Sequence, residues 1–187
     1  MDRQEQFLPA RLYQILNRWL LPPIPSELRA VVEKYQGKRN LKDIANRVRE
    51  ALVETKERGK RTKIELAALG WLYDSIRGNI KRGRVFELKQ ALTEGYADCQ
   101  GYAQIFDILG KSFGLNIGIV EVVVDNAGRY VPHSINILKL SDGRILLIDP
   151  WYGSMNINHQ RIGALVKERD RWQIKDIDWD KREELEE

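Results

Sequence analysis

The chain has 187 residues, of which 43% are hydrophobic and 31% are charged, and its formal net charge is +4 at pH 7. This composition fits a soluble protein with a real apolar core. A single cysteine excludes an intramolecular disulfide and every zinc site built from several cysteines. The first residues are too polar for a signal peptide, and no apolar run has membrane-spanning length. We therefore expect a cytoplasmic protein without a membrane partner.

The basic residues cluster in two stretches, residues 56–63 and 81–84. Stacking aromatic residues would be interleaved with these charges in a nucleic-acid-binding segment, and neither stretch has them. We interpret both stretches as solvated loops that link helices, and we expect no nucleic acid partner. A non-catalytic module that binds an acidic partner through this basic helical half is the alternative to an enzyme.

The first half of the sequence predicts helices. The expected helices cover residues 8–19, 26–37, 40–59, 62–78, 85–92 and 99–113. Asn40 is the expected N-cap of the third helix and Gly59 its end. Thr62 and Glu65 form a capping-box pattern that opens the fourth helix. Gly114 is the expected C-terminal cap of the last one.

Three strands follow the helices, over residues 117–124, 131–140 and 144–149. Turn residues separate them, so the strands predict an antiparallel meander and an α+β fold. We divide the chain into an N-terminal helical region (1–62), a catalytic core (63–155) and a C-terminal extension (156–187). The extension has no clear pattern, and we expect its end to be disordered.

Cys99 lies where a nucleophile would be placed. Asp98 is a good helix N-cap, and an apolar stripe with three- and four-residue spacing begins just after it, so the helix starts at the cysteine. A thiol in the first helical turn lies near the positive end of the helix dipole and near free backbone N–H groups, and both favour thiolate. A buried thiol without chemistry is the alternative interpretation.

A cysteine nucleophile needs a base and a group that orients the base, and the candidates are His133 and Asp149. A two-residue turn between their strands would direct the two side chains to opposite faces. A three-residue turn with Gly143 in its left-handed last position would pair Leu140 with Arg144. Both side chains would then share a face and lie within reach of each other. The triad hypothesis therefore requires the longer turn, or a bulge near it.

The same register puts an apolar set on the face of His133 and Asp149, namely Val131, Ile135, Ile137, Ile145 and Leu147. An amphipathic helix needs such a surface, so we expect the N-terminal end of the Cys99 helix to pack against this face.

Three stretches of sequence, taken in order, resemble the transglutaminase-like superfamily of cysteine enzymes. The string from Gly95 to Ala103 resembles the nucleophile helix of that family, and the residues from Gly114 to Ile117 resemble the step into its first strand. The segment Asp142-Gly143-Arg144, followed by Ile148-Asp149-Pro150, resembles the region that carries the family's aspartate. The resemblance covers residues 64–153.

The resemblance implies a papain-like α+β core and a reaction through a thioester or acyl-enzyme on a protein or peptide substrate. Cys99 would be the nucleophile, His133 the general base and acid, and Asp149 the residue that orients the histidine. Ile135 and Trp151 depart from the family pattern, as does the absence of a tryptophan at the start of the third strand, and these departures concern substrate specificity. The chain cannot build the cysteine zinc site of the peptide N-glycanase branch. Hydrolysis and amine transfer both stay open.

Three aromatic residues are candidates for substrate binding: Tyr96, Trp151 and Tyr152. Trp151 and Tyr152 either line a substrate groove or close the core. The Cys99 backbone N–H is the natural first oxyanion donor, and Gln90 or Tyr96 is the candidate for the second. We expect no cofactor and no metal ion, and the oligomeric state is left open.

Overall fold

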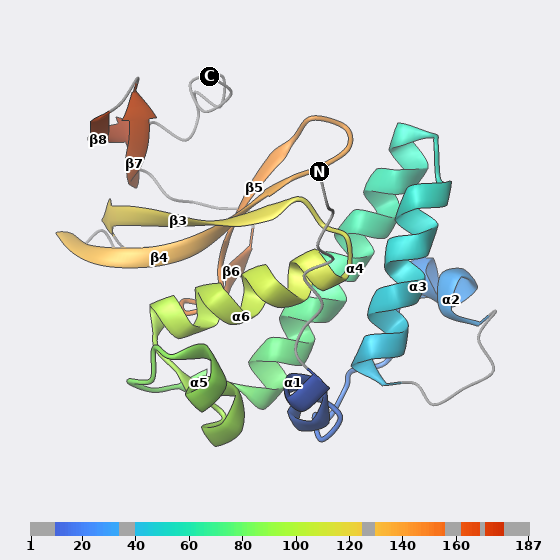
Figure 1. Cartoon of the computed structure of the whole chain (residues 1–187). Coiled ribbons are helices and arrows are strands. Elements are labelled where there is room, and N and C mark those ends of the chain that lie inside the picture. Colours follow the sequence, from blue (N-terminus) through green and yellow to red (C-terminus); the bar gives the residue numbers. More distant parts are fainter. Residues whose placement is uncertain (1–9, 34–39, 125–129, 156–161, 169–170, 178–187) are drawn as a thin grey trace.

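The computed structural model describes residues 10–33, 40–124, 130–155, 162–168 and 171–177 (Figure 1). Apart from the two-residue strands β1 and β2, the helices come first along the chain and the strands follow, so the predicted α+β class is confirmed. The described helices are α1 (Ala10–Leu16), α2 (Ser26–Val32), α3 (Leu41–Glu54), α4 (Arg58–Asn79), α5 (Leu88–Glu94) and α6 (Cys99–Ser112). The described strands are β1 (Lys81–Arg82), β2 (Tyr96–Ala97), β3 (Ile117–Val124), β4 (Tyr130–Lys139), β5 (Ile145–Asp149), β6 (Ser154–Met155), β7 (Ile162–Glu168) and β8 (Arg171–Ile177).

The predicted ends of two helices are confirmed. The Asn40 side chain caps α3 by accepting a hydrogen bond from the backbone N–H of Asp43 at 2.9 Å. Gly114 follows α6 with a φ of 79°, the left-handed conformation that closes a helix and favours glycine. Both helix ends can be predicted from the sequence because capping is an interaction within a few residues.

The predicted boundary between α3 and α4 is wrong. Gly59 does not end α3, because α3 stops at Glu54 and Gly59 lies in the first turn of α4. Thr62 lies inside α4 and does not cap it. The Glu65 carboxylate, which a capping box would direct back to Thr62, instead accepts hydrogen bonds from the Ser141 backbone N–H and hydroxyl. A tertiary partner has therefore replaced the local one.

The described strands form two sheets. Strands β1 and β2 pair in parallel, and a six-stranded sheet has the order β6-β5-β4-β3-β7-β8. The β7–β8 hairpin arises where we expected no regular pattern, and it joins the sheet through the pair Val122–Ala164. The end of the C-terminal extension, for which we expected disorder, lies outside the described residues.

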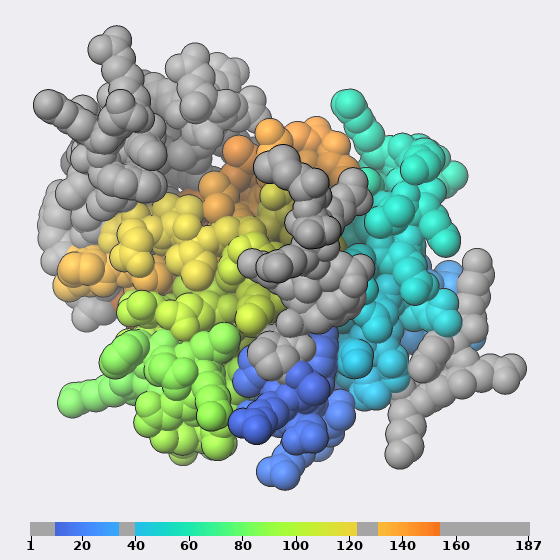
Figure 2. Space-filling view, in the orientation of Figure 1, coloured from blue at the N-terminus to red at the C-terminus, as the bar shows by residue number. Residues whose placement is uncertain are grey.

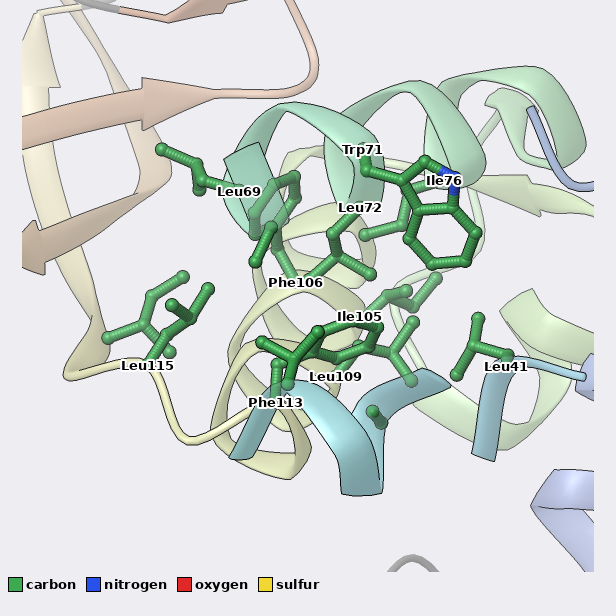
Figure 3. Close-up of a cluster of buried hydrophobic side chains, with 14 of the residues drawn as sticks. Leu41, Leu69, Trp71, Leu72, Ile76, Ile105, Phe106, Leu109, Phe113 and Leu115 are labelled. Carbon is green, nitrogen blue, oxygen red and sulfur yellow. The ribbon is translucent and has the colours of Figure 1, made fainter. Parts of the chain in front are cut away.

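The main hydrophobic core lies where α3, α4 and α6 meet (Figure 3). Phe106 and Leu109 of α6 are fully buried there against Leu72 of α4 and Leu41 of α3. The cluster extends from α1 to β5, so the N-terminal helices share one core with the segments that follow them. In Figure 2 the blue α1 lies at the lower edge of the molecule, between green residues of the α5 region and the cyan α3.

Helix α6 covers the face of the sheet opposite to the predicted one. Leu138 and Ile148 belong to the core that includes α6, and Asn136 donates a hydrogen bond from Nδ2 to the α6 carbonyl of Ala103 at 2.9 Å. The predicted face, which carries His133, holds a separate cluster of Val122, Ile135, Ile145 and Leu147. Every residue of β5 is buried, so both faces are apolar and the sequence pattern cannot choose between them.

Candidate active site

Cys99 is the first residue of α6, as predicted. The Asp98 side chain caps the helix by accepting a hydrogen bond from the Gly101 backbone N–H at 2.8 Å. The strands β1 and β2 lead up to this point, and the backbone N–H of Asp98 donates to the carbonyl of Val85 at 2.8 Å. The thiol is half-buried, so a reagent can reach it.

The turn between β4 and β5 has the three-residue form that the triad hypothesis requires. Leu140 donates to the carbonyl of Arg144, and Gly143 has a φ of 94°. The resulting register brings His133 Nε2 to 2.7 Å from Asp149 Oδ2, and both side chains are almost completely buried.

Cys99 lies beside this pair, at the part of β4 that extends beyond the end of the β4–β5 ladder. The Cys99 thiol lies near enough to the His133 side chain and to the Ser134 backbone for hydrogen bonding with both to lower its pKa. Because Asp149 engages Nε2, Nδ1 is the ring nitrogen available to the thiol. The structure therefore brings the three predicted residues together, although α6 lies on the other face of the sheet.

The end of the β4–β5 ladder explains this arrangement. The last pair of the ladder is Asn136–Ile148. Two residues further along, the same register would set Ser134 opposite Pro150. The Pro150 carbonyl, however, accepts a hydrogen bond from Arg77 Nη1 at 2.6 Å. The backbone N–H of Ser134 is thereby available to the thiol at the tip of α6.

The electrostatics of the site favour a charge-separated pair. Burial alone would lower the pKa of His133, but its hydrogen bonds to Asp149 and Cys99 outweigh burial and raise this pKa from 6.5 to about 9. The hydrogen bond from His133, helped by the one from Ser134, lowers the pKa of the Cys99 thiol against the opposing effects of burial and of Asp98. Both shifts favour thiolate and imidazolium near neutral pH.

Both oxygens of the Asp149 carboxylate are engaged. Oδ2 lies against His133, and Oδ1 accepts a hydrogen bond from the Tyr152 backbone N–H at 3.2 Å. The Tyr152 ring also contacts the His133 ring edge-on, with centroids 5.5 Å apart. The segment after β5 thus helps to hold both the carboxylate and the imidazole in place.

Two arginines hold this segment in turn. Arg77 of α4 donates to the Pro150 carbonyl, and Arg82 of β1 donates from Nε to the Trp151 carbonyl at 2.6 Å. The Arg82 guanidinium also lies over the rings of Trp151 and Tyr152. Our interpretation of the first basic stretch as a linking loop is wrong, because it lies largely in α4. The second stretch does link α4 to α5 and is exposed, but it includes β1, which contacts the site.

The other predicted residues are less closely engaged. Tyr96 is 46% exposed in β2, three residues before Cys99. The amide of Gln90 donates to Glu94 on the exposed side of its own helix at 2.7 Å. Sequence reasoning missed Arg77 and Arg82 as parts of the site, because their contacts join positions about 70 residues apart and no local pattern predicts such pairs.

Within the described residues, no group of three or more His, Cys, Asp or Glu side chains could hold a metal ion. In the same residues, no helix is long and apolar enough to cross a membrane.

No protein-family model matches the chain, and no curated protein matches its sequence. Among solved structures, Legionella pneumophila LapG is similar with a TM-score of 0.41 at 13% identity, over 72% of this chain and 77% of LapG. Its calcium-bound form is similar with a TM-score of 0.41 at 12% identity, over 86% and 98%. A TGase structure is similar with a TM-score of 0.33 at 14% identity, over 82% of this chain and half of the TGase.

Proposed function

We propose that this protein is a cysteine-dependent acyl-transfer enzyme that acts on peptide or carboxamide bonds. The observation that carries the proposal is the set Cys99–His133–Asp149, in which the thiol lies beside an imidazole that a buried carboxylate holds at 2.7 Å. Such a set supplies a nucleophile, a proton carrier and an orienting group in one place.

In the proposed first half-reaction, the Cys99 thiolate attacks the carbonyl carbon and forms a C–S bond. The negative charge moves to the carbonyl oxygen. As the C–N bond breaks, the His133 imidazolium gives its proton to the leaving amine, and a thioester remains on Cys99.

In the second half-reaction, neutral His133 takes a proton from water or from an acceptor amine, which attacks the thioester. The C–S bond breaks and the thiolate returns, paired again with imidazolium. Asp149 keeps the imidazole in the orientation that both proton transfers need. Water gives hydrolysis, and an amine gives transfer.

The backbone N–H of Cys99 is suited to stabilise the oxyanion, because the first N–H groups of a helix have no acceptor within the helix. The positive end of the α6 dipole points at the same place. These groups act on charge that develops only during the reaction, so they favour the transition state over the bound substrate.

The test is the rate of Cys99 alkylation by iodoacetamide between pH 4 and 10. We expect a reactive plateau that extends well below the ordinary thiol pKa, and its loss in His133→Ala. The matched control is His159→Ala, which removes the other of the chain's two histidines and should leave the plateau intact.

An ordinary titration of Cys99 near pH 8.5 in the wild type would refute the proposal. Salt-sensitive binding of an acidic protein that survives Cys99→Ala would then favour the non-catalytic binding module.

A further inference from the structure

Arg82 presents a cation at the surface of the site without a carboxylate partner among the described residues. Its Nε donates to the Trp151 carbonyl at 2.6 Å, and its Cζ lies 5.3 Å from the Trp151 ring centroid and 5.6 Å from that of Tyr152. The hydrogen bond uses one of the five guanidinium N–H groups. Because the side chain is exposed, the others can reach a ligand.

The aromatic rings hold the guanidinium in a defined position. The Trp151 ring is itself fixed by an edge-on contact with the buried Tyr102 ring, with centroids 6.3 Å apart. The Tyr152 ring is fixed in the same way against His133. An arginine that is already immobilised loses little conformational freedom when it binds an anion, so Arg82 is pre-organised for a carboxylate.

Arg82 also lies close to the reacting atoms. It is paired in the β1–β2 ladder with Ala97, two residues before Cys99. The contacts through the Tyr152 ring limit the separation of the guanidinium from His133 to about 11 Å, which an extended peptide spans in about three residues.

The two carboxylates close to Cys99 face groups other than Arg82. Asp98 caps α6, and Asp149 is buried against His133. The exposed neighbours of Arg82 on the same segment are Lys81 and Arg84, which have the same sign of charge. The exposed charges of this segment itself are therefore all positive, which favours an anionic ligand beside Arg82.

We propose that Arg82 is a specificity-determining residue that selects substrates with an acidic side chain within about three residues of the bond that Cys99 attacks. This inference rests on the proposed acyl-transfer function. A groove for apolar side chains formed by Trp151 and Tyr152 fits less well, because both rings already face the guanidinium.

The test uses short peptides with neutral ends that carry an electrophile: a chloromethyl ketone at the C-terminus in one series, and a chloroacetyl group at the N-terminus in the other. In both series the Cys99 thiolate displaces chloride and forms a C–S bond, which mass spectrometry detects. Each peptide carries Glu at one of three positions from the electrophile, and its twin carries Gln there. The rate ratio of each pair measures recognition of the charge alone.

We expect the best Glu peptide to react about tenfold faster than its Gln twin, the size of one charge-assisted hydrogen bond. In Arg82→Gln this ratio should fall to about one. The ratio should persist in Arg58→Gln, which removes the same charge at the opposite end of α4, about 30 Å away along the helix. A merely structural role of Arg82 would slow both twins alike and leave the ratio unchanged.

A ratio near one at every position in the wild type, or a preference that survives Arg82→Gln, overturns this inference. Its failure can be told apart from that of the proposed function by iodoacetamide. A normal alkylation plateau without a charge preference contradicts only the role of Arg82. The absence of the plateau contradicts both the acyl-transfer function and the role of Arg82.

Discussion

Replacing Asp149 by Asn is the sharpest perturbation of the site, because it keeps the shape of the side chain and removes its charge. The carboxylate is completely buried and lies 2.7 Å from His133. It is the main partner that raises the pKa of His133 to about 9. Relative to the ordinary value of 6.5, that pKa corresponds to about 3 kcal/mol in favour of imidazolium.

Removing the carboxylate should therefore shift His133 toward the neutral form near pH 7, because only the interaction with Cys99 then opposes the effect of burial on its pKa. The thiolate loses its cationic partner as a result, and the pKa of Cys99 rises toward its ordinary value. A thiol with an ordinary pKa of about 8.5 is less than about 1% ionised at pH 6. We expect Asp149→Asn to lower the rate of iodoacetamide alkylation at pH 6 at least about tenfold.

At pH 9.5 the thiolate forms without help, so the two proteins should react at similar rates. The alkylation rate constant, followed by intact mass between pH 4 and 10, checks both expectations. Asp142→Asn is the matched control, since this aspartate is exposed and pairs with Arg144 at the far end of the hairpin. An Asp149→Asn profile that coincides with the wild-type profile would refute the reasoning.

Three further outcomes concern stability. In Cys99→Ala the bond to Asp149 still keeps the pKa of His133 above its unfolded value. The free energy of unfolding from urea titration should therefore be highest below about pH 6.5 and decline as the pH rises through the folded pKa. Adding Asp149→Asn should remove this pH dependence. Leu109→Ala should cost about 2–5 kcal/mol, because the side chain is completely buried, and a cost below about 1 kcal/mol would contradict that packing. Gly143→Ala should cost about 1–2 kcal/mol from its φ of 94° alone, since no atom lies within 4 Å of the added Cβ; unchanged thermal unfolding would argue against the three-residue turn.

Much of the local structure could be predicted from the sequence, because helix capping and turn conformation depend on residues close together in the chain. Asn40 and Asp98 cap helices through side chains that reach three residues ahead. Gly143 takes the left-handed conformation that a three-residue hairpin needs, and that turn sets the register of β4 and β5. The register in turn predicted that His133 and Asp149 could meet.

The predictions that failed concern contacts between residues that lie far apart in the sequence. The residues Thr62 and Glu65 match a capping box, but Glu65 accepts a hydrogen bond from Ser141, which is 76 residues away in the sequence. The face of the sheet covered by α6 was undetermined because both faces of β5 are apolar. The contact of Arg82 with the segment after β5 was not predicted, because nothing local in residues 81–84 indicates it.

Local residues account for the helix start at Cys99 and for the hairpin register that aligns His133 with Asp149, since capping and turn conformation act within a few residues. Only the folded chain fixes where these two pieces meet. They join at the edge of β4, where Pro150 is engaged by Arg77 and the Ser134 N–H is available to the thiol. That outcome depends on packing between elements far apart in the chain, and such packing leaves no periodic mark in the sequence.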